Sequence, residues 1–134
     1  MSSKGRPYRT VEVEGFEILI GRNAVDNDHL SLSIARPNDG WLHVGGGCPG
    51  SHVVIRNPES LALPSSVVRK AAQYAAWYSK ARGRPKVEVH YCRAADVSKV
   101  RGAPAGEVRI KKVRKVFVSP APVEEVGEEV PIRP

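Results

Sequence analysis

Three side chains that can bind metal or act in catalysis lie within ten residues of one another: His43, Cys48 and His52. A zinc site needs three or four such ligands, and a nucleophile such as Cys48 or Ser51 needs a base beside it. The segment has no paired Cys-x-x-Cys or His-x-x-x-His and no acid that would orient a histidine base. We therefore predict no metal, no cofactor and no catalytic residue here. The alternative is that Cys48 acts with His43 or His52.

Four glycines, Gly45 to Gly47 and Gly50, occupy the same segment between two apolar runs. Glycine has no Cβ and permits positive φ, so its backbone N–H groups can converge on an anion. The segment is not a P-loop, because the Gly-Lys-Ser/Thr ending is absent, and it lacks the spacing of a dinucleotide fingerprint. The glycines by themselves favour a flexible β-turn, and the alternative is a loop that accepts a phosphate or a sugar edge.

The elements that must position this loop follow from hydrophobic periodicity. Asn23 can cap a short helix that reaches about residue 35. A longer helix is predicted from Pro64 to Gly83, with small residues at three- and four-residue spacing toward a sheet. Alternating apolar and polar residues predict strands at 8–20 (a hairpin), 41–44, 51–56, 86–92, 107–110 and 116–118. The predicted fold class is α+β: a mainly antiparallel sheet packed against one long and one short helix.

The charge distribution favours an anionic partner. The 134 residues carry a net charge of +7, with four glutamates in the last sixteen residues. Residues 1–118 hold 20 basic and 10 acidic residues, so their net charge is +10. Nucleic acid is the commonest partner of such a body, because cations that neutralise phosphates release counterions.

Two segments are predicted to lie outside the folded domain at 8–118. Residues 1–7 form a flexible N-terminus, and residues 119–134 form a flexible acidic tail with four prolines. No apolar run approaches the ~20 residues of a membrane span, and the N-terminus lacks the apolar core of a signal peptide. We expect a cytoplasmic protein without membrane contact.

Several sequence blocks resemble, in the same order, those of the NFACT-R domain. They include Gly21-Arg22-Asn23-Ala24, Asp39-Gly40-Trp41-Leu42-His43, Pro49-Gly50-Ser51-His52-Val53-Val54-Ile55-Arg56, Tyr78-Ser79-Lys80-Ala81-Arg82 and Gly102-Ala103-Pro104-Ala105-Gly106. The resemblance covers residues 8–118 and implies an RNA-binding domain, which usually forms the C-terminal part of large ribosome quality-control factors that engage the large ribosomal subunit and tRNA. Because the 134 residues show none of the N-terminal NFACT domain, the helix-hairpin-helix or the coiled coil of those factors, the resemblance is to the stand-alone bacterial versions, and we expect the chain to be one of them.

The resulting expectation is non-catalytic binding of structured RNA, tRNA or rRNA, in translation or ribosome quality control, with a ribosomal subunit as a further partner. Two alternatives remain: an RNA-modification accessory enzyme that uses Cys48, His43 and His52, or a protein-interaction adaptor that docks through its acidic tail or a helix. The candidate RNA contacts are Arg22, Asn23, Trp41, His43, Ser51, His52 and Arg56, with electrostatic support from Lys80, Arg82, Arg84, Lys111, Lys112 and Arg114.

Overall fold

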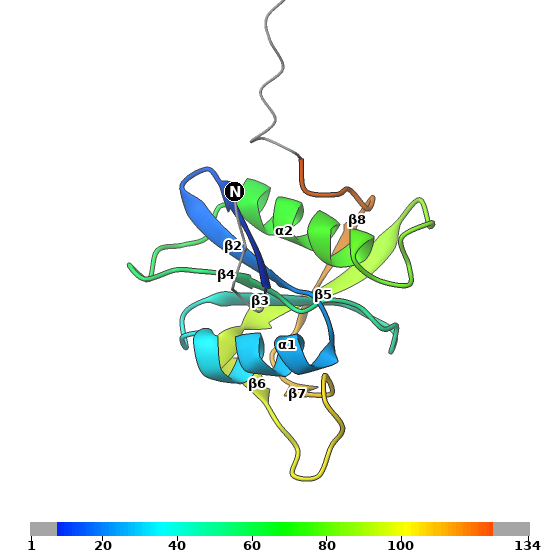
Figure 1. Cartoon of the computed structure of the whole chain (residues 1–134). Helices are drawn as coiled ribbons and strands as arrows, with labels where there is room; N and C mark the ends of the chain where they lie inside the picture. The colour runs from blue at the N-terminus through cyan, green and yellow to red at the C-terminus, as the bar shows by residue number, and fades with distance from the viewer. Residues whose placement is uncertain (1–7, 125–134) are drawn as a thin grey trace, which may run out of the picture.

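The computed structural model describes residues 8–124, which form a six-stranded antiparallel sheet with helical segments on both faces (Figure 1). The spatial order of the strands is β1-β2-β4-β3-β5-β8, and every neighbouring pair is antiparallel. The predicted α+β class is confirmed. The main strands are β1 (Tyr8–Val13), β2 (Phe16–Gly21), β3 (Gly40–Val44), β4 (Val53–Ile55), β5 (Val87–Arg93) and β8 (Arg114–Val118).

Helix α2 (Ser65–Trp77) covers one face of the sheet. Its alanines at three- and four-residue spacing, Ala71, Ala72, Ala75 and Ala76, are fully buried. They let the helix lie close to a layer of aliphatic side chains, each of which stabilises the fold by roughly 2 kcal/mol when fully buried. This layer includes Ile18, Ile20, Leu42, Val44, Val53, Ile55, Val87 and Val89.

The opposite face is covered by the short helix and a small second sheet. Helix α1 (Ala24–His29) continues into a π-helix, η1 (Leu30–Ile34), and Leu30 packs on Trp41 and Cys92. After β5, the 3₁₀ turn η2 (Ala94–Asp96) leads to β6 (Val97–Ser98), which pairs with β7 (Arg109–Ile110). The strand predicted at 107–110 therefore belongs to this separate two-stranded sheet.

The predicted short helix is confirmed, including its cap. The backbone N–H of Asp26 donates to the side-chain oxygen of Asn23 at 2.9 Å. The helix widens at its end, where the N–H of Ala35 donates to the carbonyl of Leu30, five residues earlier, at 2.9 Å. This wider turn contains Ser31, whose side chain is buried.

Helix α2 ends earlier than the predicted Gly83, and the reason is tertiary. At Trp77 the helix stops, and Tyr78 leaves helical geometry with φ −90° and ψ 48°. The next residues instead make an antiparallel bridge between Ser79 and Gly50. In this bridge the N–H of Ser51 donates to the carbonyl of Tyr78, and the N–H of Lys80 to that of Pro49, each at 2.9 Å. The helical preference of the residues after Trp77 is therefore overridden by this pairing with the glycine loop.

The segments outside the predicted domain are described in part. Residues 1–7 and 125–134 lie outside the described residues. From the predicted tail, residues 119–124 run beside α2, where the N–H of Ala121 donates to the carbonyl of Gln73 at 3.3 Å. Within residues 8–124, no helix has the length and apolar character needed to cross a membrane.

Candidate functional site

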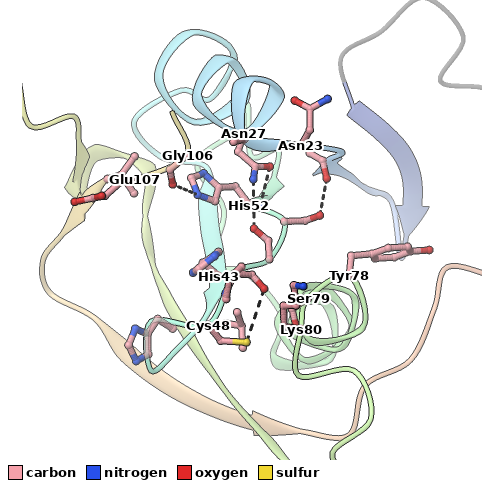
Figure 2. A pocket seen from close by; sticks show the side chains of 18 of the residues that line it. Asn23, Asn27, His43, Cys48, His52, Tyr78, Ser79, Lys80, Gly106 and Glu107 are labelled. Atoms are coloured by element: carbon pink, nitrogen blue, oxygen red, sulfur yellow. Dashed lines mark hydrogen bonds between the residues drawn. The ribbon is translucent and has the colours of Figure 1, made fainter. Parts of the chain in front are cut away.

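A cleft of about 1000 Å³ opens where four distant segments meet (Figure 2). Its walls are the start of α1, the glycine loop after β3, the turn after α2, and the loop before β7. The bridge between Gly50 and Ser79 joins two of these walls. Eight predicted site residues line the cleft: Arg22, Asn23, Trp41, His43, Ser51, His52, Lys80 and Arg82.

The floor of the cleft is held by a chain of buried hydrogen bonds. The indole N–H of Trp41 donates to the hydroxyl of Ser31 at 2.8 Å, and this hydroxyl lies 2.7 Å from Nδ1 of His52. Nε2 of His52 lies 3.1 Å from the carbonyl oxygen of Gly106. A carbonyl can only accept, so the network assigns the proton to Nε2, and Nδ1 accepts from Ser31. Both ring nitrogens of His52 are therefore committed.

This network makes His52 a neutral structural residue. Burial is the main cause that lowers the pKa of His52 to about 4, and neighbouring His43 acts in the same direction. His52 and Trp41 are each 1% exposed. Their side chains tie η1 and the loop at Gly106 to the sheet and support the cleft from beneath.

Asn27 connects the same floor to the glycine loop. Its side-chain oxygen accepts the backbone N–H of His52 at 3.1 Å, and its amide donates to the carbonyl of Gly50 at 3.3 Å. Asn27 is buried inside α1. The sequence signal for this role was an asparagine within the predicted short helix, but its partners His52 and Gly50 are 25 and 23 residues away.

His43 lies above this floor and faces the cleft (Figure 2). Its ring packs edge-on against His52, with 5.1 Å between ring centroids, and stacks at 6.1 Å on Trp41. Burial is the main cause that lowers the pKa of His43, and nearby His90 adds to it. His43 is only half-buried, and backbone hydrogen bonds to Gly50 and Val44 hold its ring at the cleft.

His90 is a cleft residue that sequence reasoning did not select. It pairs with His43 across β3 and β5, and its Nε2 lies 2.8 Å from a carboxylate oxygen of Glu88. The strict alternation of β5 already placed His90 on the face opposite Val87 and Val89. The alternation could not show that β3 is the strand beside β5, so it could not place His90 next to His43.

The glycine loop ends in a tight turn at the rim. The N–H of Cys48 lies 3.5 Å from the carbonyl of Gly45, with φ +70° at Gly46 and +72° at Gly47. Positive φ at both central positions is the pattern of a type I′ turn, which glycine adopts without strain. Both glycines are exposed, and within residues 8–124 their N–H groups have no hydrogen-bond acceptor. They are free to donate to a ligand.

Cations from β1, from the start of α1 and from the turn after α2 line the cleft. Arg22 and Lys80 are exposed, and the guanidinium of Arg22 pairs with Asp26 at 3.2 Å. Two further arginines each lie over an aromatic ring at 4.9 Å, Arg9 over Tyr78 and Arg82 over Trp77. Among the described residues that line the cleft, Glu107 is the sole acid. The cleft is therefore lined by four Lys or Arg side chains and one carboxylate, and Arg22 is already paired with Asp26.

Arg56 is not brought to the cleft, because it lies at the opposite end of β4 from His52. Its Nε lies 3.0 Å from a carboxylate oxygen of Asp39, an ion pair without hydrogen-bond alignment. The buried carboxylate of Asp39 also accepts the N–H groups of Asn57 at 2.7 Å and Arg36 at 2.9 Å. In this position Arg56 neutralises a buried acid.

The remaining predicted residues lie outside the cleft and are exposed. They are Arg84, Lys111, Lys112 and Arg114. Arg114 begins β8 at the edge of the sheet, and Lys111 and Lys112 precede it. Their charges add to the positive field of the whole domain.

The geometry does not favour a reaction at Cys48. Its sulfur lies 3.8 Å from the carbonyl of Pro49, and both ring nitrogens of His52 are already committed. The other thiol, Cys92, is buried, which raises its pKa to about 12. Within residues 8–124, no group of three or more His, Cys, Asp or Glu side chains is placed to hold a metal ion.

Comparisons with known proteins place the chain among bacterial relatives. The family model for the NFACT protein RNA binding domain matches residues 6–112. The chain is 36% identical over 122 residues to the Rqc2 homolog RqcH of Bacillus subtilis, covering 87% of this chain and 21% of the relative. It is 34% identical over 116 residues to that of Streptococcus suis, covering 86% and 20%. The chain thus spans about a fifth of these relatives.

The fold also matches a solved structure. The C-terminal of the fibronectin/fibrinogen-binding protein from Streptococcus suis aligns with a TM-score of 0.79 and 32% identity. The alignment covers 90% of this chain and 47% of that structure. The sheet and the helices on its two faces are therefore an arrangement shared with that protein.

Proposed function

The chain belongs to the family of NFACT protein RNA-binding domains, and we propose that it binds structured RNA, tRNA or rRNA, through the cleft face. The observation that carries the proposal is that Arg9, Arg22, Lys80 and Arg82, from separate parts of the chain, line one opening. Separate cations around one concave site can follow a bent phosphate backbone, which a single basic helix cannot do.

Two kinds of contact act together at this face. The four cations neutralise phosphates, which supplies most of the affinity and makes it depend on salt. Inside the rim, His43, Ser51 and Asn23 provide polar groups at fixed positions. The cations therefore bring RNA to the cleft, and the polar groups orient it.

The predicted contact residues take different roles in this proposal. Arg22, Asn23, His43, Ser51, Lys80 and Arg82 contact RNA directly. Trp41 and His52 act from beneath, because each is 1% exposed. Arg56 makes no direct RNA contact in this proposal and stabilises the fold by pairing with the buried carboxylate of Asp39. The exposed cations Arg84, Lys111, Lys112 and Arg114 extend the positive field.

The proposal extends to the setting in which the domain works. The relatives carry the name Rqc2 homolog RqcH, and the family resemblance implies ribosome quality control. We infer that the domain acts as a binding module without catalysis, in the cytoplasm, on RNA of the translation machinery, and that a ribosomal subunit is a partner. Because the chain spans about a fifth of these relatives, their other segments can contribute to ribosome binding.

Retention of labelled RNA on filters tests the proposal. The purified chain is titrated against a tRNA and against rRNA fragments at several salt concentrations. The logarithm of affinity is expected to fall linearly with the logarithm of salt concentration, with a slope near −0.9 for each phosphate contact on a duplex. Absence of salt-dependent retention for every RNA would overturn the proposal.

A further inference from the structure

We propose, resting on the RNA binding above, that the cleft takes one unpaired nucleotide of a structured RNA while Arg9 and Arg82 hold the phosphates on either side. The cleft is concave, with a volume of about 1000 Å³. Ligand pockets lie between about 300 and 1000 Å³, which includes the size of a single nucleotide. The wall of an A-form duplex is convex and keeps its bases inside, so it cannot fill such a hollow.

The two arginine-aromatic pairs prepare the rim for this ligand. Arg9 comes from β1 and Arg82 from the turn after α2, yet each guanidinium lies 4.9 Å from a ring centroid, of Tyr78 and Trp77. Arg82 is held further by a 3.1 Å hydrogen bond from its Nε to the carbonyl of Trp77. A planar guanidinium fixed on a ring keeps donors free for a phosphate and loses less entropy on binding.

Inside the rim, the available polar groups suit the edge of a base. The half-buried imidazole of His43 lines the cleft, where backbone hydrogen bonds to Gly50 and Val44 hold its ring in place. The amide nitrogen of Asn23 has no partner within residues 8–124, since only its oxygen caps α1. By contrast, the side-chain N–H groups of Trp41 and His52 already donate to Ser31 and Gly106 in the floor of the cleft. The cleft therefore offers the amide nitrogen of Asn23 and the accessible part of the His43 ring to a base.

The glycine turn adds a contact for the sugar-phosphate chain. The N–H groups of Gly46 and Gly47 make no hydrogen bond within residues 8–124, and both glycines line the cleft. Lys80 lies on the adjoining wall, which the bridge between Gly50 and Ser79 attaches to this loop. A nucleotide in the cleft would thus have donors from two adjoining walls along its sugar-phosphate chain.

The test compares RNA hairpins that differ only in one nucleotide. One hairpin is fully paired, and four others carry a single bulged nucleotide, one for each base. A sixth carries 2-aminopurine at the bulge, whose fluorescence reports stacking. At least one bulged hairpin is expected to bind about tenfold more tightly than the paired one, the size of one base-stacking contact. Fluorescence of the 2-aminopurine hairpin is expected to change on binding.

Two substitutions locate the effect. Ala105→Trp places a large ring at an exposed position that lines the cleft, and should abolish the preference for the bulge. Ala95→Trp, at an exposed position outside the cleft, is the matched control and should retain it. Thermal unfolding checks that both variants are folded. If Ala105→Trp is not, His43→Ala replaces it and should reduce the preference.

The possible failures are distinguishable. Equal, salt-dependent affinity for all hairpins, without a fluorescence change, would overturn the unpaired-nucleotide site while RNA binding stands. Retention of the preference in folded Ala105→Trp would also overturn it. Absence of salt-dependent binding to every hairpin and to tRNA would overturn RNA binding itself.

Discussion

Ser31 and His52 share a buried hydrogen bond of 2.7 Å, in which the hydroxyl donates to Nδ1 of the imidazole. The two residues come from separate elements, η1 and the segment before β4. Because Ser31 also accepts from Trp41 and His52 donates to Gly106, one histidine fixes the relation of three segments. The shape of the cleft therefore depends on this pair.

The first prediction concerns pH. The pKa of His52 is lowered from its usual 6.5 to about 4 in the folded protein. Between these two pH values the unfolded chain therefore binds a proton at His52 that the folded chain does not. Stability is complete above about pH 6.5 and is lost as pH falls toward 4. The total is about 3 kcal/mol by linkage. His43 acts in the same direction, since its pKa is also lowered.

Urea unfolding at pH 7 and pH 4.5 measures this effect. His52→Gln should be less stable than the wild type at pH 7 and should lose less stability on acidification, because one titrating group is gone. Carboxylates titrate in both proteins, so their difference isolates His52. Equal pH dependence in the two proteins would contradict the assignment.

The second prediction removes the serine of the pair. Ser31→Ala leaves Nδ1 of His52 and the indole N–H of Trp41 without their partner, which should cost about 1–3 kcal/mol for each unsatisfied buried group. Ser33→Ala, at an exposed position on the same π-helix, is the matched control. Chemical denaturation of both variants should show a clear loss only for Ser31→Ala. Similar stabilities would mean that the network is dispensable.

The third prediction concerns the bridge between two cleft walls. A Cβ at Gly50 would lie 2.6 Å from Cβ of Ser79, so Gly50→Ala forces the loop away from the turn after α2. We expect a loss of about 1–3 kcal/mol, typical of overpacking, and weaker RNA binding. Gly83→Ala is the control, because a Cβ there meets nothing within 4 Å. Thermal midpoints and RNA affinities that match in both variants would contradict the anchoring role.

The fourth prediction separates the two roles open to Arg56. Its side chain is 27% exposed and lies against the buried carboxylate of Asp39. Arg56→Ala should lower the free energy of unfolding by about 2 kcal/mol, less than for a fully buried pair because solvent screens it. The salt dependence of RNA affinity should stay unchanged. A slope reduced by about one would instead indicate a direct phosphate contact.

Much of the fold could be predicted because periodicity records which face of an element is buried. In β3 the alternation places Trp41 and His43 on one face and Leu42 and Val44 on the other, as observed. The cap at Asn23 was equally local, since its partner Asp26 is three residues away. Such features depend on neighbours in the sequence, and single-chain patterns record them.

The rest could not be predicted, because it depends on distant partners. His52 is held by Ser31 and Gly106, which are 21 and 54 residues away in the sequence. The residues next to His52 therefore could not show that its side chain is buried. The end of α2 at Trp77 is set by Gly50. The strand pattern places Arg9 on the solvent side, and it cannot show that the ring of Tyr78, 69 residues later, lies beneath its guanidinium.

The central claim is that RNA binds at the cleft rather than anywhere on a basic surface. The most direct measurement compares tRNA affinity over a range of salt for two double variants with equal charge. Lys80→Ala with Arg82→Ala removes two cations that line the cleft, and Arg36→Ala with Arg101→Ala removes two exposed cations outside it. The account predicts that the first pair lowers affinity about tenfold or more and reduces the salt slope by about two, while the second changes the slope little. Equal losses from both pairs, or none from the first, would contradict it.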